Sequence, residues 1–138
     1  TMRKRCRHSG RQMDRQTPQK HSDHKRQRMT NPQKRKGDAA ERELAKQLEA
    51  LLGFKVRRKL GAGRQDDTGD IDGLPDCTAQ AKNYADILRA INQGLKDTAT
   101  QQQNADTTHA VLFVRRRGGQ WIAIQTLEQW TTTYRETL

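Results

Sequence analysis

The distribution of charge along this chain restricts its folded part to the residues after position 36. Residues 1–36 hold 13 of the 27 Lys and Arg residues and only two acidic ones, so they account for the whole formal net charge of +11. They include four apolar residues and no aromatic one. A segment of this composition cannot bury enough apolar surface to fold by itself. We therefore expect a disordered basic arm over residues 1–36.

Residues 37–138 have the composition of a folded domain. They contain 14 basic and 14 acidic residues, and 39 of these 102 residues are hydrophobic, which is enough for one modest core. At 138 residues the chain is too short for two full-sized cores. We expect a single domain over residues 37–138.

The composition also argues against several classes of protein. No apolar run approaches the ~18 residues of a membrane-spanning helix, and the basic N-terminus lacks the apolar stretch of a signal peptide. Two cysteines are too few for a disulfide framework, which favours a reducing compartment. We expect a cytoplasmic protein of a prokaryotic or phage-infected cell, with no membrane partner.

The basic arm is suited to binding a polyanion. Each phosphate that a Lys or Arg side chain neutralises releases counterions, which gives an affinity that depends on salt and not on base sequence. An anionic membrane is a weaker alternative because the arm has no amphipathic apolar face. A merely solubilising extension is the simplest alternative. We favour nucleic acid as the partner.

Hydrophobic spacing after residue 36 predicts helices that alternate with strands. Asp38, with Glu41 at the capping-box position, is the expected N-cap of a first helix that Gly53 ends. The later elements are expected as strands 54–60, 70–74 and 77–84, helix 84–103, strands 110–114 and 121–124, and a short helix near 127–134. The order α-β-β-β-α-β-β-α predicts an α/β fold with a mixed β-sheet flanked by helices.

Glu41 interrupts the apolar pattern of the first helix. On a helical wheel it lies within about 20° of the centre of the apolar stripe, which is formed by Leu44, Ala45, Leu48, Leu51 and Leu52. A carboxylate in such a stripe is costly to bury unless another group pairs with it. Capping of the helix start is the alternative explanation, since an acid also suits the helix dipole there. The two roles are compatible.

Two short strands bear paired polar residues. Asp70 and Asp72 are two positions apart, so in a strand both carboxylates share a face and favour a hard divalent cation such as magnesium. Gln80 and Lys82 likewise project from one face of the strand 77–84. A lysine beside acidic ligands can orient water and offset charge on a phosphate. Taken singly, a solvated turn and an ordinary edge strand remain open alternatives.

Together these features resemble the PD-(D/E)xK nuclease superfamily and, more narrowly, the archaeal-type Holliday junction resolvases. The resemblance extends over roughly residues 34–84. Residues 34–44 are similar to the family's basic, glycine-led opening helix, residues 53–56 to its helix exit and first strand, and residues 61–63 to its small-residue active-site loop. Glu41 matches the family's helix glutamate.

Two further residues match the motif of this family and two depart from it. Asp70 matches the aspartate of the "PD" half, and Lys82 matches the catalytic lysine. Gly69 stands where proline is usual, and Gln80 stands where the family has an acidic residue. A carboxamide oxygen can ligate a metal but brings no charge, so Asp72 is the expected source of the missing carboxylate.

The resemblance implies a restriction-endonuclease-like fold and a magnesium-dependent endonuclease, with manganese as a substitute, that acts on branched DNA such as four-way junctions. The implied catalytic residues are Glu41, Asp70, Gln80 and Lys82, and the implied metal ligands are Asp70, Gln80, Asp72 and Glu41. The resemblance also implies a homodimer, since two opposing strands of a junction are cut, and no small-molecule cofactor. Two alternatives are a non-catalytic DNA-binding protein with a degenerate site and a restriction-like or repair nuclease for ordinary duplex.

Basic residues near these motifs are candidate phosphate contacts. They are Arg35, Lys36, Arg57, Arg58, Lys59, Arg64, Arg115, Arg116 and Arg117. The three consecutive arginines at a hairpin tip could equally form a solvated turn. Cys6, His8, His21 and His24 are residue types that bind zinc, but the stretch around them lacks the apolar residues of a zinc module, so a zinc site is not favoured. No chemical role is expected for His109.

Overall fold

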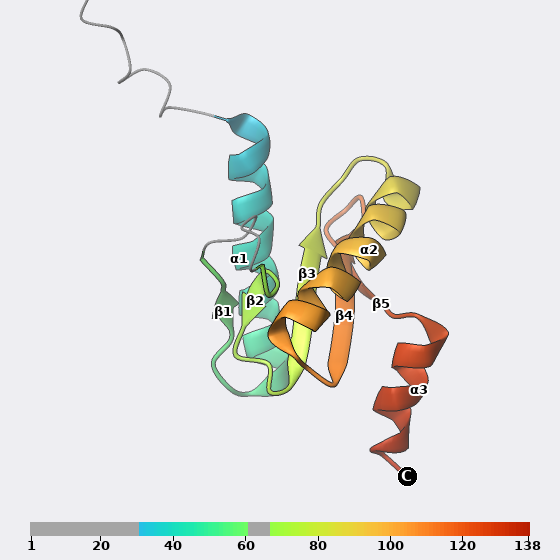
Figure 1. The fold of residues 1–138 in the computed structure, drawn as a ribbon. Coiled ribbons are helices and arrows are strands. Elements are labelled where there is room, and N and C mark those ends of the chain that lie inside the picture. The colour runs from blue at the N-terminus through green and yellow to red at the C-terminus, as the bar shows by residue number, and fades with distance from the viewer. Residues whose placement is uncertain (1–30, 61–66) are drawn as a thin grey trace, which may run out of the picture.

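The computed structural model describes residues 31–60 and 67–138, and in these residues the expected order of helices and strands is confirmed (Figure 1). The helices are α1 (Pro32–Leu52), α2 (Ile87–Ala105) and α3 (Leu127–Arg135). The strands are β1 (Arg57–Arg58), β2 (Ile71–Asp72), β3 (Cys77–Lys82), β4 (His109–Arg115) and β5 (Trp121–Ile124). None of the helices in this part of the chain is long and apolar enough to cross a membrane.

The strands form two small sheets that are joined through Asp70. In the mixed sheet β3 runs parallel to β4, and β5 runs antiparallel to β4. β1 and β2 form a separate antiparallel pair. The N–H of Asp70 donates to the carbonyl of Ala79 at 2.8 Å, and the carbonyl of Asp70 accepts from the N–H of Lys59 at 2.7 Å. The α/β class with a mixed sheet is confirmed, but two sheets take the place of the one expected.

Helix α1 begins earlier than predicted. Its N-cap is Asn31, whose side chain accepts hydrogen bonds from the N–H groups of Gln33 and Lys34, and Pro32 occupies the first turn. Proline fits there because the N–H groups of the first turn have no acceptor within the helix, so the N–H that proline lacks is not needed. The predicted cap at Asp38 is therefore wrong, and residues 32–36, which the composition assigns to the arm, are helical.

Helices α1 and α2 cover opposite faces of the mixed sheet. Leu44 of α1 packs in a cluster with Val111 of β4, whereas Ala90 of α2 packs with Leu112 and Val114 of the same strand. Neighbouring side chains of β4 thus serve opposite faces, as the period of a strand requires. Figure 1 shows α2 crossing in front of β4, with α1 beside β1 and β2. The molecule therefore has three layers, with the sheet in the middle.

The fully buried residues of α2 are small or polar, and Ile91 and Leu95 pack beside them against the same cluster. The buried positions follow helical spacing and are Ala90, Gly94, Thr98 and Gln101. Leu88, on the same helix, is 73% exposed. A Cβ atom on Gly94 would lie 2.6 Å from Leu112 Cδ1, so glycine allows the close approach of helix and strand. The helix is capped by Asp86 and does not begin at Tyr84.

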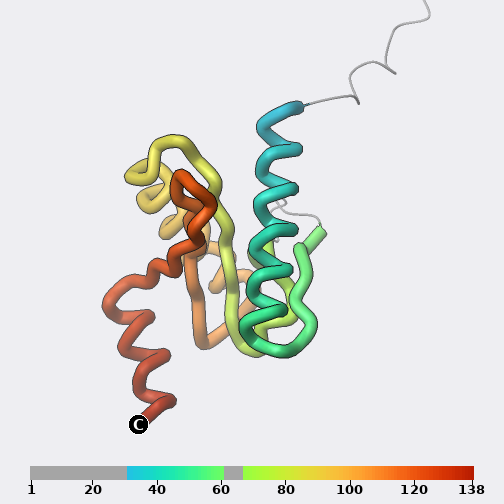
Figure 2. Tube along the Cα trace, turned by 180° about the vertical axis from the view of Figure 1, so that it is seen from behind, coloured from blue at the N-terminus to red at the C-terminus, as the bar shows by residue number. Residues whose placement is uncertain are grey.

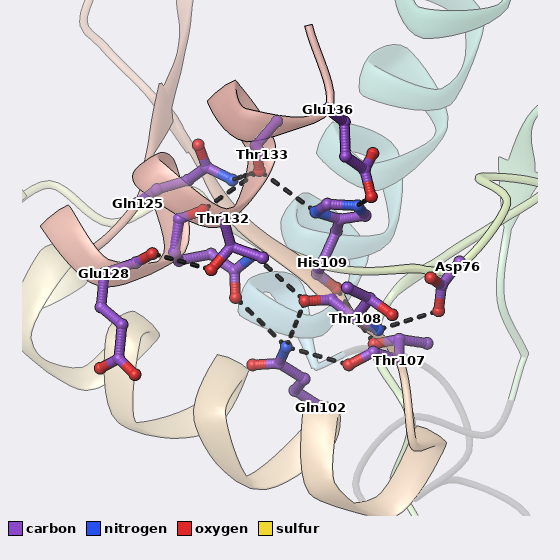
Figure 3. A network of polar contacts seen from close by, with 11 residues as sticks. Asp76, Gln102, Thr107, Thr108, His109, Gln125, Glu128, Thr132, Thr133 and Glu136 are labelled. Carbon is purple, nitrogen blue, oxygen red and sulfur yellow. Dashed lines mark hydrogen bonds and ion pairs between the residues drawn. The ribbon is translucent and has the colours of Figure 1, made fainter. Parts of the chain in front are cut away.

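Polar contacts hold α3 against the end of the sheet. His109 of β4 uses both ring nitrogens: Nδ1 lies 3.2 Å from Thr133 Oγ1, and Nε2 lies 2.8 Å from Glu136 Oε1 (Figure 3). Gln125 Nε2 donates to the carbonyl of Ala110 at 2.9 Å. α3 has no buried residue, and it lies on the side of the sheet remote from α1 (Figure 2). His109 therefore has a structural role in positioning α3.

Candidate active site

A pocket lies at the carboxyl end of β3, between α1 and the start of α2. Its volume of about 630 Å³ falls within the ~300–1,000 Å³ of typical ligand sites. Ligands of α/β folds commonly bind beyond the carboxyl ends of parallel strands. The structure brings together at this pocket the four residues that the motif singles out as catalytic, which are Glu41, Asp70, Gln80 and Lys82.

Asp70 is the buried acid of the pocket. Asp70 is 4% exposed, and its Oδ2 accepts a hydrogen bond from the N–H of Ala81 at 2.9 Å. Burial raises the pKa of the Asp70 carboxyl to about 6; the Ala81 hydrogen bond opposes this shift, and the charges of Glu41 and Asp67 add to it. A carboxylate that is costly to ionise in the free protein gains stability from a cation placed beside it.

Gly69 determines where Asp70 lies. Its φ is +110°, and a Cβ atom at this position would lie 2.9 Å from the carbonyl oxygen of Ala79. Proline has φ fixed near −65° and cannot adopt this conformation. The glycine that stands where the resembling family has proline is therefore explained by the close contact of this segment with β3.

Asp72 lies outside the pocket. Asp70 is in a bend before β2, so the alternation of the strand begins only at Ile71, which is buried. The side chain of Asp72 is half exposed, and its Oδ2 lies 3.4 Å from Arg57 Nε. The expected common face for Asp70 and Asp72 is not formed, and the structure does not bring Asp72 to the other proposed metal ligands.

Arg58 neutralises two acids of α1. Its Nε donates to Glu41 Oε2 and its Nη2 donates to Asp38 Oδ1, both at 2.6 Å. The hydrogen bond to Glu41 is the main cause of a raised pKa at Arg58, and the charges of Glu41, Asp38 and Asp70 reinforce it against burial. Arg58, predicted as a phosphate contact, thus forms an internal ion pair. Glu41 therefore lines the pocket with its negative charge already neutralised by Arg58.

Asp97 of α2 fixes the position of Lys82. Lys82 Nζ donates to Asp97 Oδ2 at 2.7 Å, and Asp97 Oδ1 accepts from Gln93 Nε2 at 3.0 Å. Burial tends to lower the pKa of Lys82, but the hydrogen bond and charge of Asp97, with a contribution from Tyr84, outweigh it and raise the pKa. Lys82 therefore stays protonated and presents a cation to the pocket. Sequence reasoning missed Asp97 because no local pattern connects it to Lys82.

Two buried polar atoms in the pocket wall have no hydrogen-bond partner among the described residues. They are Oε1 of Gln80, a residue that is 6% exposed, and Nε1 of Trp121. Leaving such an atom unpaired costs ~1–3 kcal/mol, so a bound group that satisfies it is expected. An unpaired acceptor suits a cation, and an unpaired donor suits an anionic oxygen. Trp121 gave no sign of a site role in the sequence, where it begins an apolar strand.

The pocket suits magnesium, which needs few protein ligands, better than a metal that needs three or more side-chain ligands. Over residues 31–60 and 67–138, no three His, Cys, Asp or Glu side chains gather into a metal-binding group. Of the carboxylates that line the pocket, Glu41 is paired with Arg58 and Asp86 caps α2, which leaves the Asp70 carboxylate and the carboxamide oxygen of Gln80. Magnesium prefers oxygen, keeps several waters and often takes only one or two carboxylates from the protein. These two residues meet that requirement.

The other predicted phosphate contacts are placed in different surroundings. Arg57 pairs with Asp72, and Arg115 Nε donates to Glu43 Oε2 at 2.9 Å. Lys36 lines the pocket, whereas Arg35 is exposed on α1 and Lys59 is half-buried beside β1. The exposed arginines of the β4–β5 turn line a second pocket; they are Arg116 and Arg117. Residues outside the described part of the chain are Cys6, His8, His21, His24 and Arg64.

Comparisons of this chain with protein-family models, curated proteins and solved structures give no match.

Proposed function

We propose that this protein is a magnesium-dependent endonuclease that hydrolyses phosphodiester bonds in branched DNA, on a restriction-endonuclease-like fold. The observation that supports this most strongly is one pocket with three features: the buried acid Asp70, the unpartnered oxygen of Gln80 and the fixed cation of Lys82. Hydrolysis of a phosphodiester needs oxygen ligands for a hard cation and a second positive charge near the phosphate.

Each residue of the pocket has a distinct role in this proposal. Asp70 and Gln80 would hold the magnesium ion, which when bound supplies Lewis-acid charge and a water nucleophile at neutral pH. Lys82 offsets the negative charge that develops on the phosphate. Glu41 stays paired with Arg58 and positions the α1 wall of the pocket.

The charge distribution supports DNA as the substrate. Residues 1–36 account for the net charge of +11, and Lys36 and Arg89 add positive charge at the pocket itself. Lysine and arginine side chains of this kind give salt-dependent binding to phosphates. The preference for junctions and the homodimer that cuts two opposing strands belong to the same proposal and rest on the resemblance to the resolvases.

A non-catalytic DNA-binding protein is the second candidate, and one observation favours it. Glu41 is paired with Arg58, and Gln80 brings no charge, so Asp70 is the only one of the motif carboxylates without a cation partner among the described residues. A site with a single free carboxylate binds metal more weakly than one with two.

Cleavage of a labelled four-way junction separates the candidates. We expect the wild type to cut the junction in magnesium and not in EDTA, and Asp70→Asn to cut at least about a hundredfold more slowly, the scale for loss of an electrostatic catalytic group. Asp106→Asn, which removes one charge from the end of α2, is the matched control and should cut like the wild type.

Three other results would count against this proposal. Equal cutting by the wild type and Asp70→Asn would contradict the assigned site. Absence of cutting in both magnesium and manganese would favour the binding protein. Faster cutting of a linear duplex of the same length than of the junction would indicate a nuclease for ordinary duplex.

A further inference from the structure

A second pocket adjoins the proposed active site. It lies between the β3–α2 loop and the β4–β5 turn, and its volume is about 390 Å³. The two pockets share the loop residues 84–86, of which Tyr84 is the only aromatic one. A ligand strand that occupies the first pocket can therefore continue into the second across Tyr84.

The walls of the second pocket differ in chemistry. One wall is apolar and accessible: Leu88 is 73% exposed, and Tyr84 is 39% exposed. The other wall bears Arg116 and Arg117, and Arg117 forms no ion pair with any residue in the described ranges. Asp86 is the one acid among the described residues that line this pocket, and its carboxylate already caps α2 by accepting from the N–H of Arg89. Accessible apolar side chains and guanidinium groups in one pocket suit a base and its phosphate.

Tyr84 connects this pocket to the proposed catalytic lysine. Lys82 Nζ lies 5.4 Å from the centre of the Tyr84 ring, within the range of a cation–π contact. A base that stacks on Tyr84 would therefore belong to a nucleotide next to the phosphate at Lys82. Such a base must be free of its neighbours, because a side chain can stack on a base only when the base has left the helical stack.

We infer that the second pocket binds an unpaired nucleotide adjacent to the phosphate that is cut, so that the substrate is DNA with a single-stranded segment at the cleavage point. The inference rests on the proposed function and names its substrate class more narrowly. Arg116 and Arg117 contact the backbone of the unpaired segment, and Tyr84 and Leu88 contact its base. A fully paired duplex offers no base to this pocket.

Binding measured in EDTA tests the inference without cleavage. The probes are a duplex with a short single-stranded branch, which has 2-aminopurine at the first unpaired position, and a blunt duplex with the same number of phosphates. We expect the full chain to bind the branched probe about fivefold or more tightly than the blunt one, the scale of one base–aromatic stack. The emission of 2-aminopurine should fall on binding, because stacking quenches it.

Matched variants assign these effects to the pocket. Tyr84→Leu should lose both the preference and the quenching, and Arg117→Gln should reduce the preference. The controls on α3 are Tyr134→Leu and Arg135→Gln, which remove a similar exposed ring and an exposed charge and should behave like the wild type. Equal binding of the two probes, quenching that survives Tyr84→Leu, or displacement of the probe by polyglutamate at equal charge would overturn the inference.

The result is independent of whether the protein cuts DNA. Cleavage of junctions without any preference for the branched probe would overturn this inference and leave the proposed function intact. A clear preference in EDTA with no cleavage in magnesium or manganese would overturn the proposed function and leave a binding pocket for an unpaired nucleotide.

Discussion

Lys82 Nζ and Asp97 Oδ2 lie 2.7 Å apart, and this ion pair ties the end of β3 to the middle of α2. The Lys82 side chain is 11% exposed and that of Asp97 is 33% exposed. Removing one partner of such a pair leaves the other charge buried and uncompensated. Asp97 thus acts on the proposed chemistry through Lys82, as a positioning residue.

Replacing Asp97 by Asn should change the pH dependence of cleavage. The pKa of Lys82 should fall, since burial of the amine persists while the charge of Asp97 is lost. The alkaline limb of the pH–rate profile should then move to lower pH, because Lys82 loses its proton earlier. The profile of Asp106→Asn, at the C-cap of α2, should match the wild type. An unchanged profile for Asp97→Asn would show that the pair serves stability alone.

Asp70 should make the metal-free protein less stable as the pH rises. Its pKa is about 6 in the folded protein against an ordinary value of 3.8, so the folded state binds more protons than the unfolded state between these values. The free energy of unfolding therefore falls as the pH rises from 3.8 to about 6 and then levels off.

Asp70→Asn should remove this penalty. At pH 7 in EDTA its free energy of unfolding should exceed that of the wild type by on the order of 3 kcal/mol, and the difference should vanish at acidic pH. Urea unfolding at several pH values measures this. Added magnesium should stabilise the wild type and not the variant. Equal stability of both proteins at pH 7 would contradict the claim that ionisation of the buried Asp70 carboxyl destabilises the folded protein.

Gly94 and Gly37 should respond in opposite ways to replacement by alanine. A Cβ atom on Gly94 would meet Leu112 Cδ1 at 2.6 Å, whereas one on Gly37 would meet no atom within 4 Å. We expect Gly94→Ala to lower the free energy of unfolding by ~1–3 kcal/mol through overpacking. Gly37→Ala should raise it by ~0.5–1 kcal/mol, since alanine favours a helix. Thermal unfolding measures both, and stabilisation by Gly94→Ala would show that α2 and β4 are less closely packed.

Deleting residues 1–30 should weaken DNA binding without moving the cleavage positions. The deletion leaves Asn31 and α1 intact and removes ten Lys and Arg residues and two acidic ones. If about four of these bases contact phosphate, the slope of log affinity against log salt should become shallower by roughly 3–4, at ~0.9 for each contact. A variant with Gln at positions 3, 4, 5 and 7 should give an intermediate slope. An unchanged slope would exclude the arm as a DNA contact.

The order of helices and strands is predictable from sequence because apolar residues recur at a different spacing in a helix and in a strand. This spacing can be read over a short stretch of chain. The start of α1 has a local signal too, Asn31 before Pro32, but the basic composition of residues 32–36 obscures it. Apolar spacing indicates Ile91 and Leu95 of α2, which pack on the sheet, but it does not indicate the small and polar residues that are fully buried. Gly94 is buried there because Leu112 of β4 fills the space that a larger side chain at this position would need.

The candidate site was predictable where the motif is local and not where it depends on tertiary contacts. Gln80 and Lys82 share a strand, and their common pocket follows from the period of two. Asp72 was assigned to the same face as Asp70, but the bend that Gly69 imposes before β2 separates them. The pairing of Arg58 with Glu41 joins residues that are 17 positions apart, and no sequence pattern indicates it.

The magnesium dependence of cleavage by Gln80→Glu tests the central claim most directly. A glutamate places a charged oxygen where the unpartnered Oε1 of Gln80 lies, so the metal should bind more tightly. We predict half-maximal junction cleavage at a magnesium concentration on the order of tenfold lower than for the wild type. Gln47→Glu, which adds the same charge on the exposed face of α1, should leave the requirement unchanged. An identical magnesium requirement for wild type and Gln80→Glu, or no cleavage by either protein, would contradict a metal site at Asp70 and Gln80.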